Sequence, residues 1–552
     1  MKGDYSVATE NTKSKSKPTE QDPRFGRAYT ARKAAVASPN QLASMAGYNV
    51  LQQGGNAIDA MVAVNAALGV VFPHMTGAGG DAFWLIYDAK SKKHYALNAT
   101  GRSGKNVSLD DYKDQDAIDS RGPKAAITVP GAVDGWAQAH ERFGKTSFKT
   151  CLEPAIQMAR EGFPVSASLA KFSEMRLDLL RSYETTADTF LKDGVAPYME
   201  NEFMKNEPLA KTLELVAENG RDIFYKGEIA DRICGFLQNQ GGCLSKEDFA
   251  NHRSEWVEPA EVEYRGRKVI SPPPNSDGMA TLQILGMLEN FDPSDWKDDQ
   301  AAFIDVFTRA TDLAFKDRDQ YLDDPDFNEV PIKNLLDKNY LADRAKLIAS
   351  KSQGAPEVGV GRRGDTTFSC AVDSEGNAVA VIQSLYWEWG SGLVAGETGM
   401  LLQNRGAYFS LNPNDRDHLQ PSKRPAHTLT CSIVFKDDKP ELIVGAMGGD
   451  GEPQTQATII SRVIDQGYNV QAAIDEPRWL LGRSWGDPYK GLRLEGRYSE
   501  ALIKELEDLG HINVSLMDAY SDLAGHAQAI QVFDDRLEAA ADPRAGGLAI
   551  GY

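Results

Sequence analysis

The spacing of apolar residues predicts two helices and then a strand pair in the first hundred residues. Residues 40–53 carry apolar side chains three or four positions apart behind Asn40, a residue type that caps helices. The segment 58–71 is apolar nearly all round, which is typical of a buried helix. Residues 83–87 and 94–98 are joined by a polar turn, and we expect them to be adjacent strands.

The hydrophobic pattern changes near position 366. Residues 131–345 have mainly helical periodicity, whereas 366–372 and 378–384 read as strands on either side of the turn-forming sequence DSEGN. If this loop is symmetrical, Thr366 lies opposite Ser384, with the two Cβ atoms roughly 4.5–5.5 Å apart. A Thr–Ser pair across two strands is common in sheets, so the pairing alone does not establish a functional site.

Composition indicates an ordinary globular protein with an acidic surface. The 552 residues include 60 Lys and Arg against 79 Asp and Glu, a net charge of −19, which disfavours nucleic acid and anionic membranes as partners. The five cysteines are widely spaced without a CxxC motif, so we expect buried, reduced thiols. Residues 1–30 form a polar leader without the apolar core of a secretory signal, and no segment has the length and apolarity of a membrane span. We therefore expect a cytoplasmic protein.

Three local features are candidates for chemistry. A glycine precedes Asp365 and two threonines at a strand start, where the Thr366 hydroxyl could attack the neighbouring peptide bond. The Gly-rich loop 445–451 lies between a strand and a helix, where N–H groups can converge on an oxyanion, although a tight turn is the simpler alternative. Arg102 follows a strand and could hold a carboxylate, or could be an exposed loop residue. The eight histidines show no HxH or HxxxH spacing, so no metal site is predicted.

The chain resembles the γ-glutamyltransferases (γ-glutamyltranspeptidases) from about Lys33 to Tyr552. The motifs that carry the resemblance include VASPNQLASMAGYNVLQQGGNAIDAMVA, FPHMTGAGGDAFWLIYD, DTTFSCAVDSEGNAVAVIQSL, KRPAHTLTCSIV, GAMGGDG and DPRAGGLAIGY. This resemblance implies an α+β fold, the four-layer αββα sandwich of the N-terminal nucleophile hydrolases. It also implies a precursor that cuts itself into a large segment, 31–365, and a small segment, 366–552, which stay associated as one interlocked domain.

The resemblance also assigns catalytic roles. Thr366 would cut the Asp365–Thr366 bond and then act as the nucleophile, with its freed α-amine as the general base. Gly448 and Gly449 match the family's oxyanion-hole pair. Ser384 matches a threonine that contacts the nucleophile. No metal and no cofactor are implied.

The positions that bind the substrate's ammonium group depart from the family pattern. An asparagine, a glutamine and an aspartate in typical members correspond to Tyr386, Arg405 and Tyr408 here. The change removes one negative charge and adds one positive charge where the ammonium would sit. We therefore predict a donor whose acyl group bears a carboxylate without an adjacent ammonium. Alternatively, Arg405 points away into a salt bridge and the two tyrosines only wall the pocket.

The positions that bind the substrate's carboxylate are partly kept. Two serines of the family become His427 and Thr428, whereas the family's arginine is matched by Arg102. The resemblance therefore implies that Arg102, His427 and Thr428 contact the substrate carboxylate.

The predicted activity is that of a γ-glutamyltransferase-like acyltransferase or amidohydrolase. It would take a small γ-glutamyl or related acyl amide as donor, form an acyl ester on Thr366, and pass the acyl group to water, an amine or a peptide. A glutaryl-type acylase without γ-glutamyl preference is the nearest alternative. An inactive binding homologue that never matures is the alternative from a different class.

Overall fold

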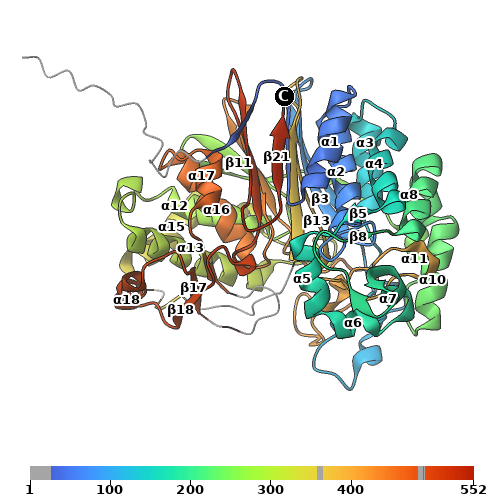
Figure 1. Cartoon of the computed structure of the whole chain (residues 1–552). Coiled ribbons are helices and arrows are strands. Elements are labelled where there is room, and N and C mark those ends of the chain that lie inside the picture. Colours follow the sequence, from blue (N-terminus) through green and yellow to red (C-terminus); the bar gives the residue numbers. More distant parts are fainter. Residues whose placement is uncertain (1–26, 353, 357–364, 483–488, 490) are drawn as a thin grey trace, which may run out of the picture.

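Two seven-stranded sheets lie face to face between two layers of helices (Figure 1). This computed structural model describes residues 27–552 except 353, 357–364, 483–488 and 490. The arrangement is the four-layer αββα sandwich that the resemblance implies. Most of the expected leader and Gly364, which precedes the expected cleavage point, lie outside the described residues.

The first sheet combines strands from both halves of the chain. In spatial order its strands are β1 (Tyr29–Ala31), β20 (Leu537–Ala541), β19 (Ala527–Val532), β15 (Lys439–Ala446), β14 (Cys431–Lys436), β11 (Arg267–Ser271) and β10 (Ala260–Tyr264). Each neighbouring pair is antiparallel.

The second sheet holds the hairpin predicted around DSEGN at its centre. Its strands are β21 (Leu548–Gly551), β2 (Ala35–Ser38), β12 (Asp365–Val372), β13 (Ala378–Tyr386), β3 (Asp81–Asp88), β4 (Lys93–Ala99) and β9 (Glu255–Val257). These neighbours are also antiparallel. The predicted strands 83–87 and 94–98 are confirmed as β3 and β4.

Each sheet is covered on its outer face by its own helices (Figure 1). Beside the second sheet lie α1 (Gln41–Gln52), α2 (Ala57–Val71), α3 (Ala132–Phe143), α4 (Phe148–Glu161) and α8 (Glu207–Asn219), with α5 (Ala167–Met175), α6 (Leu177–Arg181), α7 (Glu184–Phe190), α9 (Asp222–Tyr225), α10 (Glu228–Asn239) and α11 (Lys246–Asn251) nearby. Beside the first sheet lie α12 (Gly278–Leu288), α13 (Gln300–Tyr321), α15 (Lys338–Ser350), α16 (Gly451–Ile464), α17 (Val470–Asp475) and α18 (Glu500–Asp508), with the short α14 (Ile332–Leu335) before α15. Smaller strand groups are β5 (Phe163–Pro164) with β8 (Phe203–Met204), β6 (Leu191–Lys192) with β7 (Ala196–Pro197), and β16 (Trp479–Leu481), β17 (Leu492–Glu495) and β18 (Val514–Met517).

Three apolar cores fill the spaces between the four layers. One lies between the second sheet and its helices, one between the first sheet and its helices, and one between the two sheets. The burial of α2 explains why its sequence is apolar nearly all round, because all of its residues except Gly69 are buried. The predicted Asn40 cap is confirmed: its side chain accepts a hydrogen bond of 2.9 Å from the N–H of Leu42. Among the described residues, no helix has the length and apolarity needed to span a bilayer.

The five cysteines are free thiols, as expected. Four are buried and Cys243 is half-buried.

Candidate active site

Thr366 lies at an irregularity of the β12–β13 hairpin. The register is the predicted one from Thr367 to Val372, but it shifts by one residue before Thr367. Thr366 therefore faces both Ser384 and Leu385 of β13, and the predicted one-to-one pair with Ser384 is corrected to a β-bulge. Such bulges are frequent beside active sites because the extra residue bends one strand and redirects its neighbours.

The Thr366 side chain is enclosed without a well-formed hydrogen bond. The residue is fully buried, and its Oγ1 has no partner of good hydrogen-bond geometry among the described residues. Leaving a buried hydroxyl unpaired costs about 1–3 kcal/mol, so native structures rarely do so without a functional reason.

Ser384 supports the turn in the chain that leads away from Thr366. Its Oγ accepts a hydrogen bond of 2.7 Å from the N–H of Tyr386. Tyr386 has a φ of +85°, in the left-handed region that non-glycine residues seldom adopt. On the other side of β13, Ser384 pairs with Asp81 of β3. Ser384 thus connects the position beside Thr366 to the strained backbone at Tyr386.

The glycine loop between β15 and α16 has two unused N–H groups. Gly448 and Gly449 have φ values of +137° and +59°, which side chains would strain. Neither N–H donates a hydrogen bond to another group among the described residues. The strand before the loop lies directly over β12, because a Cβ at Gly445 would be 2.3 Å from the Phe368 ring.

Glu452 is a buried carboxylate beside Thr366 that the sequence analysis missed. It lies at the start of α16, is fully buried, and accepts a hydrogen bond of 3.2 Å from the N–H of Thr430 through Oε2. Burial raises the pKa of Glu452 well above its usual value, while the Thr430 N–H, the Thr366 hydroxyl and Arg405 favour its charged form. Thr366 Oγ1 and Glu452 Oε1 are both buried without a hydrogen-bond partner among the described residues. The only available signal was a single charged residue within GEPQTQATIIS.

Arg405 is a fully buried cation that makes no salt bridge with the described residues. None of its three guanidinium nitrogens has a hydrogen-bond partner among the described residues. Its guanidinium carbon lies 4.0 Å from the centre of the Tyr386 ring and 5.9 Å from that of Tyr408. Burial lowers the pKa of Arg405, an effect that nearby Tyr386 and Asp81 oppose. The alternative of a salt bridge is therefore not found, and both tyrosines wall the space around Arg405.

His427 and Thr428 lie in the same buried region. His427 Nε2 is 3.2 Å from Oδ2 of Asp81, and burial, with Arg405 nearby, lowers the pKa of His427 to about 4. The imidazole is therefore neutral at physiological pH. The buried Thr428 hydroxyl has no hydrogen-bond partner among the described residues.

Arg102 is engaged by carboxylates of the protein itself. It pairs with Asp324 at 3.0 Å, with Glu255 at 3.4 Å, and also with Asp326. These carboxylates raise the pKa of Arg102 against the effect of burial. Its proposed contact with a substrate carboxylate stays a prediction, and a substrate would have to compete with these partners.

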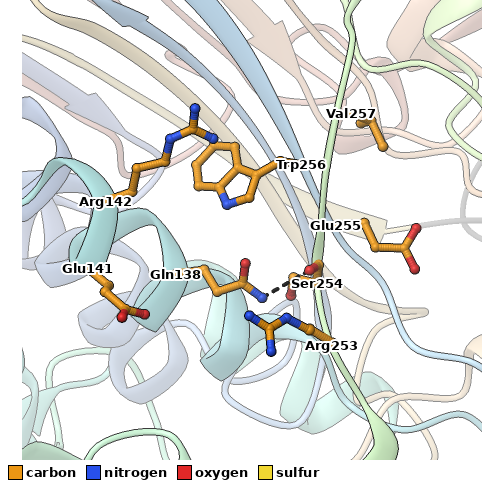
Figure 2. Close-up of a pocket in the computed structure, with 8 residues that line it drawn as sticks. All are labelled: Gln138, Glu141, Arg142, Arg253, Ser254, Glu255, Trp256 and Val257. Carbon is orange, nitrogen blue, oxygen red and sulfur yellow. Dashed lines mark hydrogen bonds between the residues drawn. The ribbon is translucent and has the colours of Figure 1, made fainter.

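A surface hollow lies next to this ion-pair group (Figure 2). Within it Arg142 packs against the ring of Trp256, 4.3 Å from the ring centre, and Gln138 donates a hydrogen bond to the Ser254 carbonyl. Figure 2 shows the Glu255 side chain directed away from Gln138, and this carboxylate binds Arg102. The hollow contains none of the predicted catalytic residues.

A second buried ion group holds the glycine loop. Arg318 of α13 lies 2.8 Å from Asp450, the residue after Gly449, and 3.3 Å from Asp277. Burial is the main cause that raises the pKa of Asp277 to about 7, and the Asp450 charge adds to it while Arg318 opposes it.

One group of side chains has the spacing of a metal site. Asp59, His140 and Cys151 offer ligand atoms close to one another. However, the Asp59 carboxylate already accepts hydrogen bonds from the backbone N–H groups of Asn56, Lys145 and Thr146. These hydrogen bonds include the capping box of α2, which accounts for the position of the Asp59 carboxylate.

Comparison with known proteins gives consistent matches over nearly the whole chain. The family model described as gamma-glutamyltranspeptidase matches residues 43–552. A glutathione hydrolase-like YwrD proenzyme of Bacillus subtilis (strain 168) is 46% identical over 520 residues, covering 94% of this chain and 98% of the relative. An oxamate amidohydrolase proenzyme of Klebsiella pneumoniae subsp. pneumoniae is 39% identical over 521 residues, covering 93% and 98%.

A solved structure shows the same fold. The crystal structure of a cephalosporin acylase from Bacillus halodurans matches with a TM-score of 0.87 and 31% identity, covering 99% of each chain.

Proposed function

The chain belongs to the gamma-glutamyltranspeptidase family, an enzyme family of acyltransferases and amidohydrolases, and we propose that Thr366 is its nucleophile. The precursor would cut itself between Asp365 and Thr366. The names of both relatives support this step, because each is called a proenzyme. The freed α-amine of Thr366, with an ordinary pKa of roughly 7.7–8.0, is suited to act as general base near neutral pH.

The proposed reaction passes through an acyl ester on Thr366. The amine takes the proton from Oγ1 as this oxygen attacks the donor's amide carbonyl, and the proton then passes to the leaving amine. The N–H groups of Gly448 and Gly449 would bind the oxyanion, where one such donor typically contributes about 3 kcal/mol. Water or an amine then takes the acyl group from Thr366, with Ser384 holding the neighbouring chain in place.

The donor class follows from one observation, the buried and unpaired guanidinium of Arg405. At an effective dielectric of about 20, a unit charge 4 Å away contributes about 4 kcal/mol, and even a third of this value corresponds to about tenfold in affinity. A donor carboxylate would gain from this interaction and an ammonium would be repelled. We therefore propose a donor whose acyl group bears a carboxylate without a neighbouring ammonium. Oxamate, in the name of one relative, has such an acyl group.

A γ-glutamyl donor such as glutathione is the second candidate, because another relative is named glutathione hydrolase-like. Its acyl group carries both the carboxylate and the ammonium. The two candidates therefore differ in whether an ammonium is accepted beside Arg405. In both, His427, Thr428 and Arg102 are the further predicted contacts of the carboxylate.

Kinetics with paired glutaryl and γ-glutamyl anilides test the proposal. We expect wild type to have the higher kcat/KM for the glutaryl compound, and Arg405→Gln to lower the ratio of the two kcat/KM values about tenfold. Arg536→Gln serves as the control, since it removes a cation between β19 and β20 that pairs with Glu538 and is not a predicted binding residue, and it should leave the ratio unchanged. A preference of wild type for the γ-glutamyl anilide, or an unchanged ratio in Arg405→Gln, would contradict the assignment.

A further inference from the structure

We propose that Glu452 is the proton acceptor for the self-cleavage of the precursor. This inference rests on the proposed function, because it requires that Thr366 cuts the Asp365–Thr366 bond. It concerns the step before the α-amine of Thr366 exists.

The uncut chain needs a base other than Thr366 itself. Before cleavage the Thr366 nitrogen is part of a planar amide, whose lone pair is delocalised and does not accept a proton. The Thr366 hydroxyl is a weak nucleophile unless a neighbouring group removes its proton. The base must therefore come from another element of the fold.

Glu452 has the position and the free atom that this step requires. Glu452 lies at the start of α16, directly after the glycine loop and after β15, which packs on β12 at Gly445 and Phe368. Thr366 Oγ1 and Glu452 Oε1 are both buried without a hydrogen-bond partner among the described residues, and the Thr366 hydroxyl favours the charged form of the carboxylate. Oε2 is held by the Thr430 N–H at 3.2 Å, which fixes the group, whereas Oε1 has no hydrogen-bond partner among the described residues. The Glu452 N–H in turn donates a hydrogen bond of 3.0 Å to the Gly449 carbonyl, which connects the backbone of Glu452 to the glycine loop.

The proton balance of the step is complete. Glu452 accepts the Oγ1 proton as Oγ1 bonds to the Asp365 carbonyl carbon, and returns it to the Thr366 nitrogen as the C–N bond breaks. The product is an ester between Asp365 and Thr366 with a free α-amine. Water then hydrolyses the ester, giving its hydroxyl to the Asp365 carbonyl and its other proton to Oγ1.

The surroundings of Glu452 set the expected pH dependence. Arg405 favours the ionised carboxylate, Asp277 opposes it, and the thiol of Cys431 also faces it. Burial is the dominant effect and raises the pKa of Glu452, which favours its protonated form. Only the ionised form accepts a proton, and the cleavage rate should therefore increase as the pH rises through the pKa of Glu452.

The test follows cleavage of full-length chains made by timed cell-free synthesis, on denaturing gels from pH 6 to pH 9. Glu452→Gln keeps an oxygen for the Thr430 N–H but cannot accept the proton. We expect about 100-fold slower cleavage with no rise against pH, and partial recovery in Glu452→Asp. Glu441→Gln is the control, because it removes a carboxylate from the far end of β15, where Glu441 pairs with Arg267.

Urea unfolding shows whether Glu452→Gln has folded, so a folded but uncut variant supports the inference. Cleavage of Glu452→Gln at the wild-type rate, or slower cleavage that keeps the wild-type pH dependence, would overturn it. A wild-type chain that is not cut between Asp365 and Thr366 would instead refute the proposed function, and this inference with it.

Discussion

The hydroxyl of Ser384 links the nucleophile to the strained backbone at Tyr386. Ser384→Ala removes the Oγ that accepts a hydrogen bond from the buried Tyr386 N–H, a loss that costs about 1–3 kcal/mol. If this loss displaces the neighbours of Thr366, maturation or turnover should slow by about 5- to 150-fold. Gel assays of cleavage and steady-state kinetics measure both rates, with Ser384→Thr as the variant that keeps the hydroxyl. Peptide mapping that finds the acyl group on Ser384 would show that Ser384 is the nucleophile.

Asp277 should make stability depend on pH. Its folded pKa of about 7 is above that of an ordinary aspartate, so its contribution to stability is complete at low pH and is lost as the pH rises through 7. Asp277→Asn lacks this loss, while Arg318 keeps its contact with Asp450. Between pH 5 and pH 8, wild type should lose about 2–3 kcal/mol of unfolding free energy relative to Asp277→Asn.

Urea unfolding at the two pH values measures this difference, in a Thr366→Ala background so that the chain stays single. Equal pH dependence in both proteins would show that Asp277 is ionised in the folded state throughout.

The contact between β12 and β15 is an element-scale feature of the site. A Cβ at Gly445 would overlap the Phe368 ring, so Gly445→Ala should destabilise the protein by about 1–3 kcal/mol through overpacking. A smaller side chain in Phe368→Leu should reduce that cost. Gly235→Ala in α10 is the control, since its Cβ would meet nothing within 4 Å and it should gain up to about 1 kcal/mol of helix stability. Unfolding free energies of the single and double variants measure the coupling, and a cost independent of Phe368 would contradict this contact.

The sheet topology predicts how the whole molecule behaves after cleavage. Strands β12 and β13 of the small segment lie between β2 and β3 of the large segment, and the first sheet also combines both segments. At the chain end, the Tyr552 carbonyl accepts hydrogen bonds from the N–H groups of Arg32, Lys33 and Ala34. Cutting one peptide bond leaves these ladders intact, so the segments 1–365 and 366–552 should stay together.

Size-exclusion chromatography should therefore give one particle before and after cleavage, while denaturing electrophoresis separates two chains. Elution of separate segments under native conditions would contradict the interlocked arrangement. The interlocked arrangement would be further supported if subtilisin digestion or urea released the small segment only when the whole protein unfolds.

The sequence by itself determined the local features of this protein. Periodicity gave the buried helix α2, the capped helix α1 and the strands β3 and β4, because these depend on residues close together in the chain. The hairpin register was predictable from Thr367 to Val372, since a short turn fixes which residues pair. The resemblance supplied the αββα fold and the predicted roles of Thr366 and of the glycine pair.

Only the tertiary structure decided how distant residues meet. The β-bulge at Thr366 places this residue opposite both Ser384 and Leu385, which the length of the turn alone does not predict. Glu452 lies 86 positions from Thr366 in the sequence, and the two come into one buried region because α16 follows β15, which packs on β12. The burial of Arg405 without a salt bridge among the described residues is likewise a result of packing, with Tyr386 and Tyr408 around it. Charge and residue type can be read along the chain, but burial and proximity arise only from folding. Burial and proximity then decide the pKa of each ionisable group and the partners with which it interacts.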